Sequence, residues 1–447
     1  MFFSMGRWSP PRFFHGLCVG FWCTALAVVR ANAQAPEGPV ADADSLTLEA
    51  AVELALIHSP GLAAFDAHSA ALDLVPSQVG ALPDPVLSLN AMNLPTDTFD
   101  LDQEAMTQMQ IALSQKIPFP GKRTLKRAAA EHEARAGQAR AAEQRDVLTG
   151  AVRSTWWRLF SIERALEIVA QNQDLMRDFN KIAQTKYAVG KGLQQDVLLA
   201  QLELSRLLDR ETRLRGRRRT TEAELNSLID RSPNRTVVLA RTPPSVHLPE
   251  LPAEGVLLER AADSRDLLAV HRDLLEAADT RVALAKRERY PDFRLGAGYG
   301  FRQGDDPLRG GERPDLFSVM VSVNVPLYSG AKQSKAIDQR TSERTQRSHS
   351  LNDALRSVEV EIMRSLADYE AAREQVLLLD TAIIPQAQQT VASMLAGYQV
   401  NEVDFLNVVN GQLTLYNSQI NYWEALSEAK QALARLAAAV GTEALYE

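Results

Sequence analysis

The feature that most constrains the fold is an internal duplication with a period near 208 residues. Four short segments of the first half return in the same order in the second half, at offsets of 205 to 211 residues. The chain is therefore predicted to use one structural unit twice, over residues 46–232 and 251–441. A Pro-rich connector (233–250) joins the two repeats, and 442–447 form a C-terminal tail. The matched pairs are SPGL (59–62) with SRDL (264–267), LPDPVLSL (82–89) with YPDFRLGA (290–297), IPFPGK (117–122) with VPLYSGAK (325–332), and Tyr187 before QLEL with Tyr398 before QLTL.

Each repeat is predicted to contain very long helices. Between Lys122 and Val189 there is no proline, and residues that favour helices dominate. At about 1.5 Å per residue, a helix of this length measures roughly 100 Å. From Leu193 to Leu228 and from Val408 to Val440, mostly apolar residues recur at alternating spacings of four and three. This heptad spacing predicts coiled-coil packing of long helices within 122–231 and 331–440.

Each repeat also contains a predicted β-hairpin, at about 84–117 and 292–326. FRLGAGYGF (293–301) and FSVMVSVNV (317–325) alternate with period two, and nine residues suffice for a tilted strand to cross a bilayer. The first hairpin alternates less cleanly and is placed by the repeat. A half-buried hairpin in a soluble protein is the alternative interpretation. We predict a lipid-facing set (Phe293, Leu295, Tyr299, Phe301, Phe317, Val319, Val321, Val323) and a lumen-facing set (Arg294, Ser318, Ser322, Asn324).

The N-terminal segment, residues 1–33, has the pattern of a cleaved secretory signal. Arg7 and Arg12 precede an apolar run (16–29), which small residues at 31–33 follow. A membrane anchor is the alternative, but about 14 apolar residues are few for a span. Residues 34–45 are then an extended N-terminal segment. Both cysteines, Cys18 and Cys23, lie within the predicted signal, so the mature chain is expected to have no disulfide.

Composition and motifs limit the possible functions. Among the 447 residues, 45% are hydrophobic and 23% are charged, which excludes a disordered chain. The 49 basic residues less Arg7, Arg12 and Arg30 leave 46 against 56 acidic ones, a mature charge of about −10 that disfavours nucleic acid as a partner. Nucleophile-elbow, zincin and P-loop motifs are absent, and the histidines are scattered. We therefore expect no enzyme, no cofactor and no metal site.

Two membrane-length hairpins fused to long coiled-coil helices in a secreted, duplicated chain resemble the outer-membrane efflux protein (TolC-like) family. The resemblance covers about 46–441, and its most specific parts are the strand-to-helix junctions IPFPGKR and VPLYSGAK. It implies a mostly α fold with a small membrane β part, in the outer membrane of a Gram-negative bacterium. It also implies a homotrimer whose strands, four per chain, close a 12-stranded β-barrel, which an α-helical barrel continues across the periplasm. Four strands cannot close a barrel alone, because single-chain barrels begin at about eight.

The resemblance also implies a function and partners. The protein is expected to be the passive exit duct of a tripartite efflux system, in contact with outer-membrane lipid. Substrates would come from an inner-membrane pump, driven by protons, through a periplasmic adaptor (membrane fusion) protein. The segment LPDPVLSLNAMNLP followed by IPFPGKR is most similar to members that work with heavy-metal pumps, so heavy-metal cations or drugs are the expected substrates. The alternative is a periplasmic coiled-coil scaffold or adhesin that never enters a membrane.

The turns YAVGKGLQQDVL and YQVNEVDFLNVV resemble the periplasmic tip of the family, where helices close the pore and meet the adaptor. Relatives often carry acids where this chain has Asn407 and Asn410. Asp196, Glu402 and Asp404 then supply a weaker cation-attracting constriction, with Lys191 as a candidate to offset their charge. These side chains are alternatively ordinary turn and capping residues. The candidate tip and adaptor-contact residues are Tyr187, Gly190, Lys191, Asp196, Tyr398, Glu402, Asp404, Asn407 and Asn410.

Overall fold

The computed structural model describes residues 45–240, 245–306, 308–400 and 402–446. The described residues belong to one compact unit, which begins at Asp44. The predicted signal and nearly all of the predicted extended segment lie outside the described residues.

The two halves contain the same succession of elements. The first half has α1 (Leu48–His58), α2 (Pro60–Asp73), α3 (Val75–Gly80), β1 (Val86–Met92), β2 (Gln108–Ile117), α4 (Lys122–Ala188) and α5 (Gln194–Leu228). The second has α6 (Glu254–Ser264), α7 (Asp266–Arg287), β3 (Phe293–Phe301), β4 (Leu316–Val323), α8 (Gln333–Leu378), the π-helix η1 (Leu379–Ile383), α9 (Ile384–Gln399), α10 (Phe405–Val440) and the 3₁₀ turn η2 (Glu443–Leu445). In both halves short helices precede a pair of strands, and long helices follow them.

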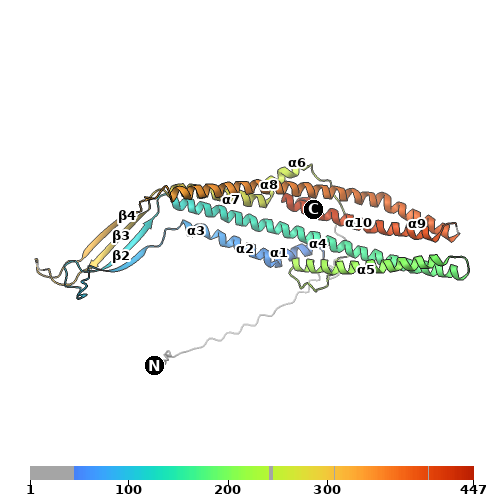
Figure 1. Cartoon of the computed structure of the whole chain (residues 1–447), viewed down its shortest axis with the longest axis horizontal. Helices are drawn as coiled ribbons and strands as arrows, with labels where there is room; N and C mark the ends of the chain where they lie inside the picture. Colours follow the sequence, from blue (N-terminus) through green and yellow to red (C-terminus); the bar gives the residue numbers. More distant parts are fainter. Residues whose placement is uncertain (1–44, 241–244, 307, 401, 447) are drawn as a thin grey trace, which may run out of the picture. The chain divides into compact units, whose positions relative to one another are not determined.

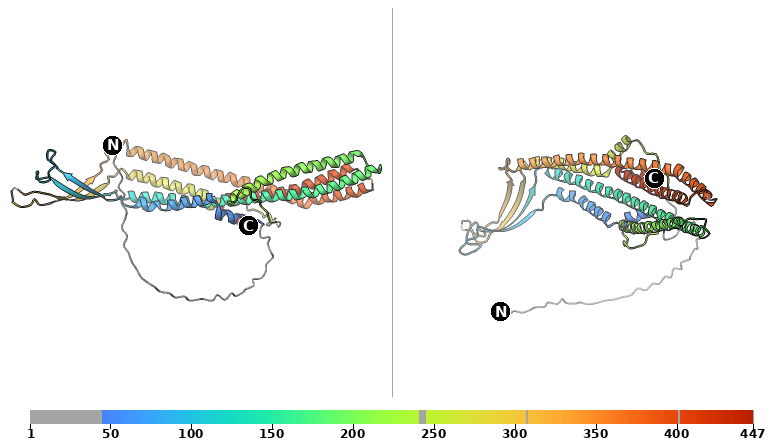
Figure 2. Two further views of the ribbon diagram at one scale, coloured as in Figure 1. Left: turned by 90° about the horizontal axis from the view of Figure 1, so that it is seen from below. Right: turned by 45° about the vertical axis from the view of Figure 1, so that its right-hand side comes forward.

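The helices lie side by side, and their order changes along the molecule. Next to the strands, α2 and α3 pack on α4, α4 packs on α7, and α7 packs on α8. Farther from the strands, α5 packs on α4, and α10 packs on both α4 and α8 (Figure 1, Figure 2). α4 runs through both regions because no proline interrupts its 67 residues. It thereby connects the strands at one end with the α4–α5 turn at the other.

The middle of α4 is the densest part of the core. Trp156, Trp157 and Phe160 are almost fully buried there, and Phe160 contacts the ring of Trp423 from α10 edge to face at 5.8 Å. The indole Nε1 of Trp156 donates to the carbonyl of Leu46 at 3.3 Å, and that of Trp157 donates to the hydroxyl of Tyr446 at 2.8 Å. Both ends of the described chain are therefore fixed to the same segment of α4.

The predicted seam of α5 is confirmed from Ala200 onward, because Ala200, Leu207, Leu214 and Leu225 are all buried, whereas Leu193 at its start is 58% exposed. The seam predicted for α10 was too narrow. Tyr416 and Ile420 lie outside the predicted spacing, yet both are buried. The reason is that α10 packs on α4 and α8 together, and two neighbours require two apolar faces.

Two boundaries differ from those predicted. β4 ends at Val323, and Asn324 lies beyond it, with its amide N–H donating to the carbonyl of Asp292 at 3.0 Å. The second-half long helix contains the π-turn η1, just before Pro385. Proline lacks the amide hydrogen and its ring conflicts with the carbonyl four residues earlier, so a wider turn accommodates it.

Among the described residues, no single helix is both long enough and apolar enough to cross a membrane. By length and composition, the bent pair Leu48–His58 and Pro60–Gly80, at 46° to each other, does meet those criteria together.

Candidate channel surfaces

The four strands form one antiparallel sheet in the order β1-β2-β3-β4. The register aligns alternate residues across all four strands: Ile111 pairs with Tyr299, and Tyr299 pairs with Phe317. All eight predicted lipid-facing residues consequently share one face with Leu87, Leu89, Met109, Ile111 and Leu113. Most of these side chains are exposed, up to 73% for Leu89 and 71% for Val319. An exposed face that is apolar except for Gln115 of β2 thus spans all four strands.

The opposite face of the sheet is polar and small. It carries Arg294, Ser318 and Ser322 of the predicted lumen-facing set, whereas Asn324 lies past the end of β4. It also carries side chains that the sequence reading missed, in particular Gln108 and Gln110 of β2. A Cβ at Gly298 would lie only 2.8 Å from Nε2 of Gln110, and one at Gly300 would overlap the side chain of Gln108. The glycines of β3 therefore make room for these glutamines, and the period-two pattern of TQMQIALSQKI was the available signal.

Both edges of the sheet are open. Among the residues that the structure describes, β1 pairs only with β2, and β4 pairs only with β3. Each edge strand therefore presents backbone N–H and C=O groups that can pair with another strand.

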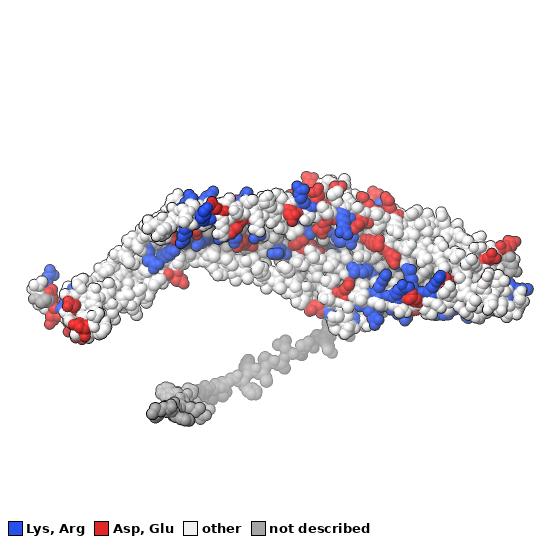
Figure 3. All heavy atoms as spheres, viewed as in Figure 1, with Lys and Arg blue, Asp and Glu red and all other residues white. Residues whose placement is uncertain are grey.

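At the far end of the strands, two arginines hold the connecting loops. The guanidinium of Arg313 donates to the carbonyls of Asp102, Gln303 and Asp305 at 2.9 to 3.1 Å. That of Arg302 donates to the carbonyls of Ala105 and Pro314. Figure 3 shows acidic side chains gathered at this end. The acids of these loops are Asp97, Asp100, Asp102, Glu104, Asp305, Asp306, Glu312 and Asp315.

At the near end, Asp292 fastens the strands to the helices. Its carboxylate lies 2.7 Å from Nζ of the buried Lys122 and 3.3 Å from Nζ of Lys116, and it accepts the amide N–H of Phe119 at 3.1 Å. Phe119 stacks on Tyr290 with ring centroids 4.7 Å apart. Partial burial alone would raise the pKa of Asp292, but the hydrogen bonds from Lys122, Phe119 and Lys116 lower it below its usual value. The repeated Pro-Asp of LPDP and YPDF was the signal for this anchor.

At the other end of the helices, the α4–α5 and α9–α10 turns lie together (Figure 1). Nζ of Lys186 donates to the carbonyl of Tyr398 at 3.0 Å and lies 3.8 Å from the centroid of its ring. Phe405 contacts Tyr398 and also Phe179 of α4. The predicted tip residues of the two repeats are thus brought together. Lys186, which joins the turns, was not among the predicted residues.

The two turns differ although the repeat makes them equivalent. Tyr398 is 8% exposed and Tyr187 is 50% exposed. A Cβ at Gly192 would lie 2.9 Å from Cβ of Lys186, and one at Gly397 would lie 2.5 Å from Cγ2 of Val403. Lys186 and Gly397 are equivalent in the repeat, as are Gly192 and Val403. In the first turn the glycine is Gly192 and the larger residue is Lys186, whereas in the second the glycine is Gly397 and the larger residue is Val403. The glycine has therefore moved to the opposite member of the pair, and the backbone still approaches closely in both turns.

The acids predicted at the tip lie at its surface. Asp404 occupies the N-cap of α10 without a side-chain capping bond, and its carbonyl accepts the amide of Asn407 at 3.1 Å. Glu402, Asp404, Asn407 and Asn410 are exposed, and Gly190 adopts a positive φ of 72°. Burial first, and then the carboxylate of Asp196, raise the pKa of Tyr398.

The offsetting role predicted for Lys191 has no support in the ion pairs of the described residues. None of them joins Lys191 to Glu402 or Asp404. The backbone amide of Lys191 closes its own α4–α5 turn by donating to the carbonyl of Lys186 at 2.9 Å. The cation that reaches the other turn is Lys186.

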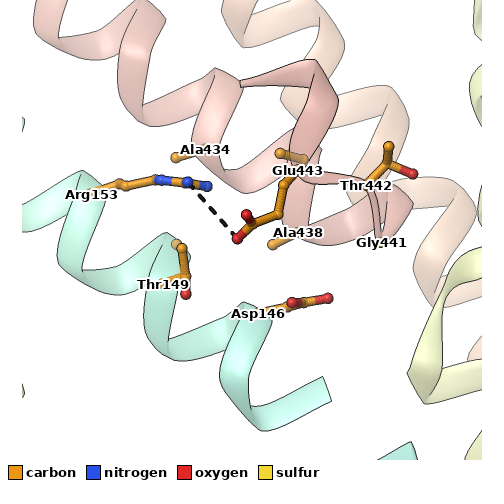
Figure 4. Close-up of a pocket in the computed structure, with 10 residues that line it drawn as sticks. Asp146, Thr149, Arg153, Ala434, Ala438, Gly441, Thr442 and Glu443 are labelled. Carbon is orange, nitrogen blue, oxygen red and sulfur yellow. Dashed lines mark ion pairs between the residues drawn. The ribbon is translucent and has the colours of Figure 1, made fainter. Parts of the chain in front are cut away.

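A small pocket of about 60 Å³ lies between α4, α10 and the C-terminal segment (Figure 4). Arg153 and Glu443 pair across it at 3.8 Å, and Asp146 and Thr149 line it. Burial, followed by the charges of Asp266 and Glu443, raises the pKa of Asp146. In the described ranges, no group of three or more His, Cys, Asp or Glu side chains is placed to hold a metal ion. The pocket is too small for a drug-sized ligand, and it lies where helices pack against one another.

The chain is similar to known proteins along most of its length. The sequence model of the family described as outer membrane efflux protein matches residues 51–230 and 257–442. The cobalt-zinc-cadmium resistance protein CzcC of Cupriavidus metallidurans is 22% identical over 426 residues, covering 93% of this chain and 96% of the relative.

Two solved structures have the same fold. The outer membrane protein VceC of Vibrio cholerae superposes with a TM-score of 0.71 at 20% identity, covering 88% of this chain and 96% of VceC. The open state of the Neisseria gonorrhoeae MtrE outer membrane channel superposes with a TM-score of 0.72 at 15% identity, covering 88% of this chain and 89% of MtrE. The chain belongs to the outer membrane efflux protein family.

Proposed function

We propose that three copies of this chain form a closed duct, with the apolar face of the sheet in lipid and the polar face around the lumen. The observation that carries the proposal is the exposed apolar face, which water would solvate poorly and a bilayer would cover. The open edge β4 of one copy pairs with the open edge β1 of the next. Three sheets of four strands then close into a barrel of twelve.

The helices continue the duct into the periplasm. Because the strands lead into helices that lie side by side, the order α2, α4, α7 and α8 follows the order of the strands. The α4–α5 and α9–α10 turns form the periplasmic tip, where the pore closes and an adaptor protein binds. An inner-membrane pump supplies the energy and the substrate, and this chain is the passive exit.

The substrates are divalent transition-metal cations. Support comes from the relative CzcC, whose name assigns it to cobalt, zinc and cadmium resistance and whose length this chain covers almost completely. Metal selectivity in this proposal lies with the pump, and the duct provides a route out of the cell.

The experiment is deletion of the gene, followed by growth in graded Co²⁺, Zn²⁺ and Cd²⁺ and, separately, in a panel of drugs. The deletion strain is expected to become sensitive to the metals, and the unchanged chain to restore growth. Val319→Arg should fail to restore it, whereas Ser318→Arg should succeed. Sensitivity to drugs alone would overturn the metal assignment, and equal complementation by both variants would overturn the assignment of the faces.

A further inference from the structure

The polar face of the sheet carries an unusual pair of like charges at its helix end. Lys116 of β2 and Arg294 of β3 are direct cross-strand partners in the register. Both belong to the face that the proposed function assigns to the lumen. Like charges directly opposite each other on neighbouring strands destabilise a sheet, so this placement needs an explanation.

The surroundings do not neutralise the pair. Asp292 lies within 3.3 Å of Lys116, but the same carboxylate also binds the buried Lys122 at 2.7 Å. Within the described residues, no ion pair or hydrogen bond is made by the side chain of Arg294, which is exposed. One carboxylate is therefore shared by two lysines, and Arg294 adds a further positive charge at this level of each chain.

Nothing farther along the same face offsets this surplus. The polar-face positions of the four strands hold no Asp or Glu at all, so the only formal charges there are Lys116 and Arg294. The remaining members are Val86, Ser88, Asn90, Met92, Gln108, Gln110, Ala112, Ser114, Gly296, Gly298, Gly300, Leu316, Ser318, Met320 and Ser322.

We infer that Lys116 and Arg294 form a cationic ring in the duct, at the passage from the helical tunnel into the barrel, which concentrates anionic solutes and repels free cations. The inference rests on the proposed trimer, in which three such pairs surround one lumen. Rings of Lys and Arg favour anions in pores. A transported metal would then pass this level as a neutral or anionic complex, while the acids of the tip attract cations at the opposite end.

The local charge can be measured with a thiol probe, because Cys18 and Cys23 are the only cysteines and both lie in the predicted signal. Ser322→Cys places a thiol on the residue paired with Arg294. Its rate of modification is compared for a sulfonate-bearing and a trimethylammonium-bearing methanethiosulfonate, in outer-membrane vesicles at low salt. The ring raises the thiolate fraction equally for both reagents, so their rate ratio isolates the local potential.

The ratio of anionic to cationic rates, normalised to a free thiol, is expected to be several-fold above one and to fall toward one in 1 M salt, where the Debye length is about 3 Å. Adding Lys116→Gln and Arg294→Gln should bring it near one, whereas Lys116→Arg with Arg294→Lys should leave it raised. Ser318→Cys, which lies four residues before Ser322 in β4 and farther from the ring, should show a smaller ratio of the two rates.

Two results would contradict the inference in different ways. If Ser322→Cys reacts with both reagents but the Gln substitutions leave the ratio of the two rates unchanged, the cationic ring is refuted and the proposed duct is not. If Ser322→Cys reacts with neither reagent while Val321→Cys reacts with both, the polar face does not line the lumen, and the proposed function fails together with the ring.

Discussion

At the scale of single residues, neighbours in the sequence are expected to respond in opposite ways. Val319 lies on the apolar face and Ser318 on the polar face of β4. A charge at the bilayer midplane costs about 2 to 4 kcal/mol on a lipid-facing position and little on a lumenal one. Val319→Arg should therefore greatly reduce the amount of assembled protein in isolated outer membranes, and Ser318→Arg should not. Similar amounts of both variants would refute the two-faced sheet.

The anchor at Asp292 predicts a pH dependence of stability. Its folded-state pKa is lowered from an ordinary value of about 3.9, so the carboxylate contributes stability above pH 4 and loses it as the pH falls through the folded-state pKa. Asp292→Asn should lower the thermal unfolding midpoint at pH 7, and the difference from the unchanged chain should shrink below pH 4. A difference in unfolding midpoint that is constant from pH 7 to pH 3 would show that the effect comes from the shape of the side chain at position 292 and not from its charge.

The tip acids make a prediction about conductance. Asp404 and Glu402 are exposed on a turn that threefold assembly would bring around one axis. Asp404→Ala should weaken block by multivalent cations in planar bilayers without changing the yield of trimer, because one negative charge per chain is lost. Asn407→Asp should strengthen the block. Unchanged conductance and block in both variants would place the constriction elsewhere.

The sequence predicted the positions of some functional side chains and not of others, for physical reasons. Period-two alternation predicted the two faces of β3 and β4, because successive side chains of a strand point to opposite faces and one face here is apolar while the other is polar. It missed Lys186, because the bond from Lys186 to the carbonyl of Tyr398 joins positions 212 residues apart and leaves no local pattern. It paired Tyr187 with Tyr398 correctly as repeats but could not predict that one would be buried and the other exposed.

At the scale of elements, the break in the second long helix is the clearest departure from the expected pattern. α4 is uninterrupted, whereas α8 and α9 are separated by η1 immediately before Pro385. The long helices themselves were predictable from composition and heptad spacing. The π-turn was overlooked because the effect of one proline depends on whether neighbouring helices hold the chain on its course.

Replacing this proline tests the explanation. Pro385→Ala restores an amide hydrogen and removes the ring that conflicts with the carbonyl of Thr381, so a regular α-helix becomes possible. Hydrogen exchange of the amides in 379–384 should slow by at least severalfold. Gln386→Ala, one residue farther along, is the matched control and should leave exchange unchanged. Equal effects of the two variants would show that the π-turn has another cause.

At the scale of the whole molecule, the duplication explains why one chain supplies four strands and paired long helices. The repeat predicted the order of the elements. The register of the sheet could not be deduced, because it depends on pairing between β2 and β3 across 175 to 191 intervening residues. Charge is also distributed unevenly along the sheet, with acids in the loops at one end and Lys116, Lys122 and Arg294 at the other. This polarity would orient the electrostatic field along the duct.

The most direct test of the duct is the conductance of the protein itself. The chain is extracted from isolated outer membranes with detergent, purified as an oligomer and added to planar lipid bilayers. Discrete conductance steps are expected from the unchanged chain, and none from an equal mass of Val319→Arg, whose strands cannot stay in lipid. Recovery of the mature chain from the soluble periplasm without detergent, together with bilayers that stay silent after its addition, would contradict the account.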